Sequence, residues 1–99
     1  MKLLPNEVYT FKLTSGEEVV AKFIKQGDSV FTVTNPLSVA MSQEGMQLIA
    51  SVFTAKPDRH IELQRTSVSM IAETRQELEA SYIEATTGVR PVTKQIITG

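Results

Sequence analysis

The chain of 99 residues contains no cysteine and no tryptophan, and histidine occurs once. Without cysteine the protein can form neither a disulfide nor a thiolate zinc site. No apolar run approaches the roughly 20 residues that a membrane-spanning helix needs, and the apolar stretch at the N-terminus is too short for a signal peptide. We therefore expect a soluble, cytoplasmic protein that has no contact with a membrane.

An excess of charge of either sign is also lacking. The sequence has 10 basic and 11 acidic residues, which gives a formal net charge of −1. Proteins that coat nucleic acid by bulk electrostatics carry a large excess of Lys and Arg, so this mode is excluded, while a local basic patch stays open. The length and the apolar fraction of 41% are those of a single globular domain.

The residues that carry enzyme chemistry do not form a recognisable set. His60 stands in a Pro-Asp-Arg-His loop, and no nucleophile with an orienting group accompanies it. The five glycines are scattered through turns rather than gathered in a phosphate-binding loop, and the acidic residues show no convergent pattern of metal ligands. We therefore predict that the protein is not an enzyme and has no catalytic residue, no metal and no cofactor.

Alternation of apolar and polar residues predicts a series of short β-strands. In residues 8–14 the side chains of Tyr9 and Phe11 share one face, and Gly16 supplies a hairpin turn before the next strand. Asn35-Pro36 must bend the third strand, end it or place it at an edge, because Pro cannot donate to a ladder. The strands after the first are expected at 18–25, 29–35, 37–41, 46–53, 61–63 and 68–71. Such spacing, with tight turns, favours a small antiparallel barrel or sandwich.

Two of these segments raise questions of their own. Residues 46–53, MQLIASVF, are nearly all apolar, so we expect burial on both faces of this strand. Within residues 61–71, IELQRTSVSMI, four polar residues separate two apolar strands without any Gly, Pro or Asp to make a turn. This break is either a polar turn whose side chains bond their own backbone or a set of side chains that faces a ligand.

The pattern becomes helical near the C-terminus. Thr74 and Glu77 have the spacing of a capping box, Leu78 and Tyr82 follow at helical spacing, and Gly88 is a suitable stop. We predict a helix over 75–87. The tail, residues 89–99, is expected to be flexible or ordered only against a partner.

A small open barrel leaves two strand edges, which are hazardous unless they are paired or covered. Residues 46–53 and 68–72 are the candidates for the outer strands. Pairing one of them with the other on a neighbouring copy is a head-to-tail contact, and this contact closes a ring when it is repeated about an axis. Alternatively, the C-terminal helix covers one edge and the protein is a monomer.

The sequence resembles the Sm/LSm family of small ring-forming RNA-binding proteins over roughly residues 8–72. The first motif of that family is matched in its apolar frame and its turn by Phe11, Leu13, Gly16, Val19, Phe23 and Asp28, with Ala21 where the family prefers Gly. Thr32 stands at the family's Asn, and Val30 at its base-stacking position. Residues 63–71 match the frame of the second motif, with Gln64, Arg65 and Ser67 in place of Arg, Gly and Asn. The order of strands and turns also resembles Sm-like proteins of tailed phages.

The resemblance implies a mainly β fold: a small, strongly bent, five-stranded antiparallel Sm-like barrel over residues 1–72. Residues 73–99 would add a C-terminal helix and tail to the same domain, whereas the family's helix is usually N-terminal. The protein would form a homo-oligomeric ring of roughly five to seven subunits and bind single-stranded RNA, or in second place DNA, at the pore. The residues implied for that site are Asp28, Val30, Thr32, Gln64, Arg65 and Thr66.

Arg65 could stack on a base and bond phosphate, and Gln64 and Thr66 could bond base edges, phosphate or a 2′-hydroxyl. The alternative is a structural module, for example a phage assembly component, that binds no nucleic acid. In that case the helix and the tail would bind a protein.

Overall fold

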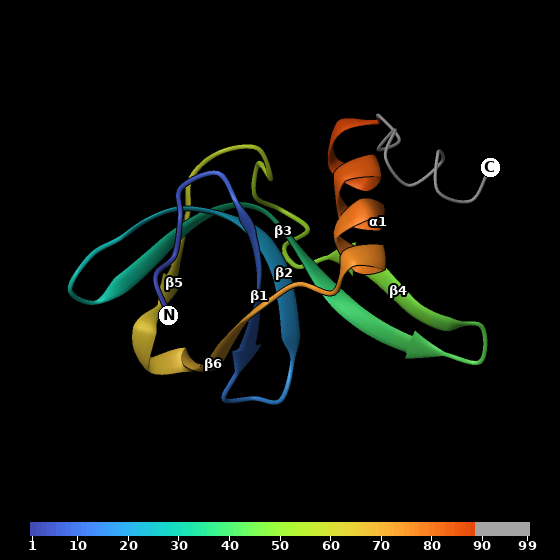
Figure 1. The fold of residues 1–99 in the computed structure, drawn as a ribbon, viewed down its shortest axis with the longest axis horizontal. Coiled ribbons are helices and arrows are strands. Elements are labelled where there is room, and N and C mark those ends of the chain that lie inside the picture. Colours follow the sequence, from blue (N-terminus) through green and yellow to red (C-terminus); the bar gives the residue numbers. More distant parts are fainter. Residues whose placement is uncertain (89–99) are drawn as a thin grey trace.

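One antiparallel sheet, described here from a computed structural model for residues 1–88, makes up most of the fold (Figure 1). The elements are β1 (Val8–Leu13), β2 (Glu18–Gln26), β3 (Val30–Ser42), β4 (Gly45–Ala50), β5 (Ile61–Gln64), the short 3₁₀ helix η1 (Arg65–Ser67), β6 (Val68–Glu73) and α1 (Gln76–Thr87). The strands lie in the order β4-β3-β2-β1-β6, and β5 pairs with the first half of β3. The predicted tail, 89–99, lies outside the described residues.

The mainly β fold with a C-terminal helix is confirmed, with six strands rather than five. The second half of β3 pairs with β4 and its first half with β5, so two short strands share one long partner. Within residues 1–88 no ladder joins β5 to β6, because β5 pairs with β3 while β6 pairs with β1. The sheet is therefore strongly curved but not closed, and a barrel stays a prediction.

The bend expected at Asn35-Pro36 lies inside a single strand. Asn35 has φ 52°, which places it in the left-handed region. The pairing of β3 with β2 jumps from Leu37 to Thr34 while β2 advances by two residues, so β3 holds one extra residue as a bulge. The Asn35 N–H donates to the carbonyl of Pro57 at 2.7 Å. The loop between β4 and β5 thereby satisfies a donor that the bulge removes from the ladder.

The main core lies on the concave face of the sheet. Its buried members are those that the alternation placed on one side of each strand: Tyr9, Phe11, Val19, Ala21, Phe23, Phe31 and Val33. The rings of Tyr9 and Phe23 meet edge to face with centroids 6.2 Å apart, and those of Phe11 and Phe31 lie 5.9 Å apart. These spacings are within the range of favourable aromatic pairs, and the predicted face of the first three strands is confirmed.

A second buried cluster fixes α1 to the sheet. Tyr82 is 1% exposed, and its hydroxyl donates to the carbonyl of Thr34 at 3.1 Å and accepts the N–H of Lys22 at 3.0 Å. Lys22 and Thr34 are register partners at the bulge. The tyrosine hydroxyl therefore bridges two backbone groups of β2 and β3 where the bulge disturbs their ladder.

The helix has the predicted extent but not the predicted cap. Arg75 is the N-cap residue and makes no side-chain capping bond. The capping box is wrong because the hydroxyl of Thr74 bonds the hydroxyl of Thr10 at 3.0 Å instead. At the other end Gly88, with φ 76°, donates its N–H to the carbonyl of Glu84 at 2.8 Å, so the predicted stop at Gly88 is confirmed.

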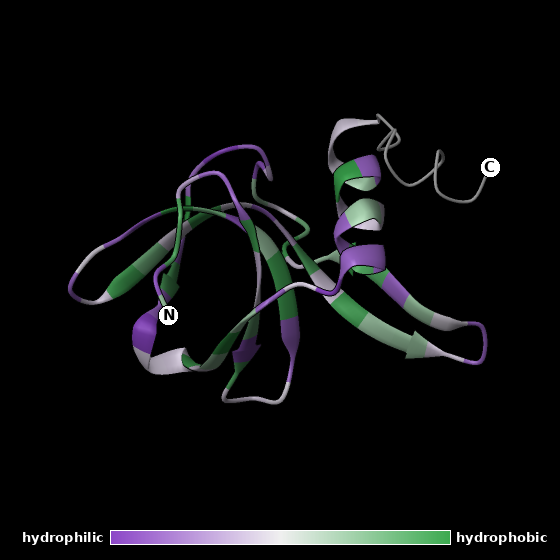
Figure 2. Cartoon of the chain, viewed as in Figure 1, coloured by the Kyte–Doolittle hydropathy of each residue, from purple (hydrophilic) through white to green (hydrophobic). Residues whose placement is uncertain are grey.

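The hairpin of β3 and β4 projects from the body of the sheet (Figure 1). Figure 2 shows that hydrophobic segments continue from the body into this hairpin. The expected burial of residues 46–53 on both faces is wrong, since Met46 and Ile49 are 40% and 47% exposed and the strand ends at Ala50. Beyond its end, Phe53 is 86% exposed. The apolar run lacks the second layer that burial on both faces would need.

Candidate functional site

Two turns distant in sequence lie together at one end of the sheet. The first, residues 27–29, joins β2 to β3, and the second is η1. The N–H of Arg65 donates to the carbonyl of Ser29 at 2.9 Å, and its Nη1 donates to the carbonyl of Gly27 at 3.1 Å. Val30 and Gln64 are register partners where β3 and β5 meet the turns. The structure thus brings together the two segments that the sequence analysis assigned to one site.

The polar break needs no glycine because it forms one turn of 3₁₀ helix. A 3₁₀ turn uses ordinary right-handed backbone angles that any residue adopts. The N–H of Val68 donates to the carbonyl of Arg65, and the N–H of Thr14 donates to the carbonyl of Ser67 at 2.8 Å. The backbone of the break is therefore hydrogen-bonded on both sides, and the side chains of Gln64, Arg65 and Thr66 are exposed.

The guanidinium of Arg65 is held in place by a ring and a carbonyl. Its Cζ lies 5.0 Å from the centroid of Phe31, which is within the distance of a cation–π contact. Within residues 1–88 the ion pairs are Lys12–Glu18 and Arg75–Glu77, so Arg65 makes no ion pair with a carboxylate there. Arginine has five N–H donors, and the hydrogen bond to Gly27 uses one of them.

The six implied site residues separate into three groups. Asp28, Gln64, Arg65 and Thr66 are exposed, and we call these four residues the turn patch. Val30 is half-buried beside it. Thr32 is 4% exposed within β3, where its register partners are Lys25 of β2 and Glu62 of β5, so its hydroxyl is not exposed to a ligand in solvent.

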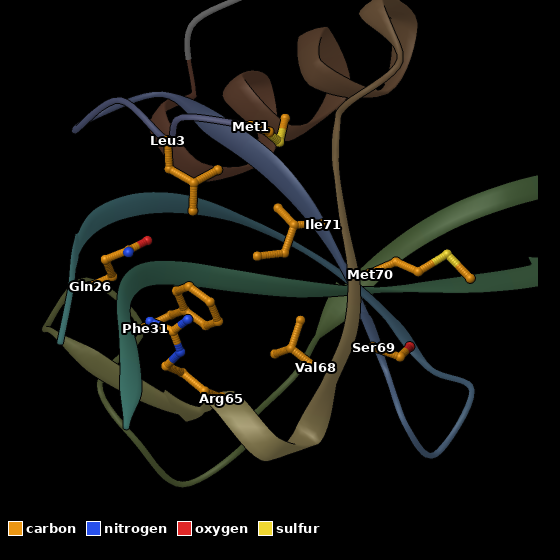
Figure 3. Close-up of a pocket in the computed structure, with 9 residues that line it drawn as sticks. All are labelled: Met1, Leu3, Gln26, Phe31, Arg65, Val68, Ser69, Met70 and Ile71. Carbon is orange, nitrogen blue, oxygen red and sulfur yellow. The ribbon is translucent and has the colours of Figure 1, made fainter. Parts of the chain in front are cut away.

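Sequence reasoning did not find two parts of this region. Phe31 was assigned to the core face, yet it also supports Arg65. Beside them lies a pocket of ≈ 430 Å³, whose wall includes Leu3, Val68 and Ile71 (Figure 3). The pairing of Phe31 with Leu63, next to the turn, is what brings the ring under Arg65, and only the strand register reveals it.

Other chemistry is sparse in the described part of the chain. No three His, Asp or Glu residues within 1–88 gather as a metal site would require. His60 is exposed in the loop before β5. Burial raises the pKa of Tyr82 to about 12, and the hydrogen bond from the Lys22 amide offsets part of that rise. None of the helices in residues 1–88 has the length and apolar character to cross a membrane.

Comparison with known proteins gives a likeness of fold. No protein-family model and no curated protein matches the sequence. Among solved structures, the chain is similar to one chain of the "Crystal structure of the NatC complex bound to CoA", with a TM-score of 0.50 and 13% sequence identity. The match covers 80% of this chain and 96% of that chain, so the two are of similar size. At this identity the likeness concerns the fold alone.

Proposed function

We propose that this protein is an Sm-like subunit that assembles with copies of itself into a ring and binds single-stranded RNA, or in second place DNA, through the turn patch. The observation that carries the proposal is the placement of Arg65. Its guanidinium is oriented by Phe31 and Gly27, has no carboxylate partner within residues 1–88, and lies among exposed polar side chains. Arginine so held can stack on a base and bond phosphate.

The arrangement of strands supports assembly. β4 and β6 stand at the two ends of the strand order, and each has one neighbouring strand within residues 1–88. Met70 on β6 is 65% exposed, and Met46 and Ile49 on β4 are also exposed. Pairing β4 of one copy with β6 of the next would cover the open edges of these two strands and these side chains. It would also repeat the turn patch around an axis, with one Arg65 and one Asp28 from each copy.

We expect Arg65→Ala to weaken oligonucleotide binding by about tenfold or more, because a hydrogen bond to a charged group contributes roughly 1.5–3 kcal/mol. The measurement is fluorescence anisotropy with oligo-U, oligo-A and single-stranded DNA at two salt concentrations. Arg59→Ala is the matched control, since it removes the same charge from an exposed loop residue outside the turn patch. Equal losses in the two variants, or no binding by the wild type at low salt, would contradict the proposal.

For the assembly, we expect Met70→Lys to convert the ring to smaller species, because it places a charge on an edge strand that the neighbouring copy would cover. Light scattering after size-exclusion chromatography measures the mass. Ala85→Lys serves as the control on an exposed position of α1. A wild-type protein with the mass of one chain, or an unchanged mass in Met70→Lys, would rule the ring out.

A second candidate, a protein-binding module, is favoured by a different observation. Met41 at the end of the projecting hairpin is 74% exposed, and Phe53 is 86% exposed. Large apolar side chains exposed to this degree are typical of contact surfaces for other proteins. The anisotropy measurement on the wild type separates the two candidates, since this module binds none of the three oligonucleotides.

A further inference from the structure

The pocket beside Arg65 has a mixed lining that suits one kind of small molecule. Leu3, Phe31, Val68 and Ile71 form its apolar wall, and Arg65 lies at its border (Figure 3). Its volume of ≈ 430 Å³ is within the range of small-molecule sites. Ser69 and Met70 of β6 also line the pocket, although their side chains point away from the four apolar side chains (Figure 3).

A second hollow of ≈ 490 Å³ adjoins the first, and the two share Met1, Leu3 and Gln26. The first residues of the chain therefore separate two spaces rather than fill one. This segment is held by few bonds: the N–H of Leu4 donates to the hydroxyl of Tyr9 at 2.9 Å, and the N–H of Asn6 donates to the carbonyl of Phe23 at 2.7 Å. A side chain such as Leu3 could move aside for an apolar group without breaking a strand.

The charges around the two spaces have one sign. Arg65 lines the first space, Lys2 and Lys25 line the second, and no Asp or Glu lines either of them. In a chain with 11 acidic and 10 basic residues this is a local excess of positive charge. An apolar wall with cations at its border is complementary to a molecule that has an apolar body and an anionic group.

We propose that the first pocket, the one lined by Phe31, Arg65, Val68 and Ile71, binds a small amphipathic anion. The apolar body lies against Phe31, Val68 and Ile71, and the anionic group accepts hydrogen bonds from the guanidinium of Arg65. The cation–π contact with Phe31 and the hydrogen bond to the carbonyl of Gly27 hold the guanidinium at the border, so its orientation exists before the ligand arrives. The proposal is independent of the nucleic-acid function, but it has a consequence for it. Because Arg65 belongs to both sites, the anion and an oligonucleotide weaken each other's binding by the same factor.

Calorimetric titration with decanoate is the first test, with decyltrimethylammonium as a cation of the same chain length and uridine monophosphate as an anion without an aliphatic body. We expect decanoate to bind and the cation not to bind. We also expect Arg65→Leu to weaken decanoate binding about tenfold or more. The substitution removes the charge-assisted hydrogen bonds of the guanidinium and leaves aliphatic bulk at this position. Equal binding of the cation, or binding of uridine monophosphate in place of decanoate, would overturn the assignment.

Two further variants locate the site. Ile71→Trp fills the pocket and should abolish decanoate binding while it leaves Arg65, and hence oligonucleotide binding, in place. Leu3→Trp fills the same space from a segment outside the sheet, so it provides the test if Ile71→Trp fails to fold. Lys56→Ala is the control, since this exposed lysine lies in the loop before β5 and lines neither space. Decanoate binding that persists in both filled variants would refute the site.

Discussion

Replacing Tyr82 with phenylalanine is expected to lower the free energy of unfolding by about 2 kcal/mol or more. The substitution keeps the ring but removes the hydroxyl that donates to the carbonyl of Thr34 and accepts the N–H of Lys22. Tyr82 is 1% exposed, so water does not readily replace the lost partner. A buried backbone group without a partner costs about 1–3 kcal/mol, and this variant leaves two such groups.

Urea unfolding followed by circular dichroism measures this loss, and Tyr9→Phe is the matched control. The hydroxyl of Tyr9 accepts a single bond from the N–H of Leu4, a residue that is 50% exposed. Water can reach that amide, so we expect the control to lose less than about 1 kcal/mol. Losses of the same size in the two variants would show that the hydroxyl of Tyr82 has no special role.

Hydrogen exchange separates the local cause from a general loosening of the fold. The amide of Lys22 loses its acceptor in Tyr82→Phe, so its exchange should accelerate strongly. The amide of Phe23, the next residue in the chain, donates to the carbonyl of Glu7 at 2.8 Å and should keep its protection relative to the global stability. Equal acceleration of both amides would indicate global destabilisation instead.

Stability is expected to fall above pH 10 more steeply in the wild type than in Tyr82→Phe. Burial raises the pKa of Tyr82 to about 12 in the folded protein, whereas an unfolded tyrosine ionises near pH 10. The unfolded state therefore releases this proton first. The contribution of Tyr82 is fully present below about pH 10 and is lost as the pH rises to about 12, with a total on the order of 2–3 kcal/mol.

Melting temperatures of both proteins at intervals from about pH 8 to 12 test this expectation. Lysine side chains and Tyr9 are present in both proteins, so their effects cancel in the difference. The two curves should run in parallel up to about pH 10 and then converge, because the wild type loses an advantage that the variant never had. A constant difference throughout the range would refute the assigned pKa.

Much of the sheet followed from local pattern, and the errors came from contacts distant in sequence. The faces of β1, β2 and β3 were read from alternation because one side of each strand packs into a single core. The hydroxyl of Thr74 was expected to cap the helix, but Thr10 competes for it from 64 residues away. The sequence indicated only that Tyr82 lies at an apolar position of a helix. Its hydrogen bonds to Lys22 of β2 and Thr34 of β3 depend on the bulge in β3, which helical spacing does not reveal.

The apolar run at 46–53 shows a different limit. Hydrophobicity predicts that the side chains of a segment are buried, but it does not say whether they are buried within their own chain or against another one. Within residues 1–88 β4 pairs with β3 alone, and the hairpin projects from the body. The apolar run that indicated burial in a core is also compatible with an edge strand that pairs with a second copy of the chain.

The meeting of the two turns could be anticipated from the sequence, because it depends on topology rather than on side-chain detail. The resemblance to the Sm frame placed Asp28 and residues 64–66 in one region, and the turns do meet there. The resemblance also included Thr32, whose burial between neighbouring strands could not be read from a motif position. The contact of Arg65 with Phe31 depends on the register of β3 and β5, which no short motif encodes.

The pairing of β1 with β6 also determines the order in which the protein can fold on the ribosome. This ladder joins Tyr9 to Glu73, whereas only residues 14–17 separate β1 from β2. At synthesis rates of about 5–20 residues per second, β1 spends on the order of 3–12 s with one side unpaired before β6 is made. Nascent chains on neighbouring ribosomes present the same open side during that interval. Translation speed across residues 14–73 therefore sets how long each nascent chain can pair with the wrong copy.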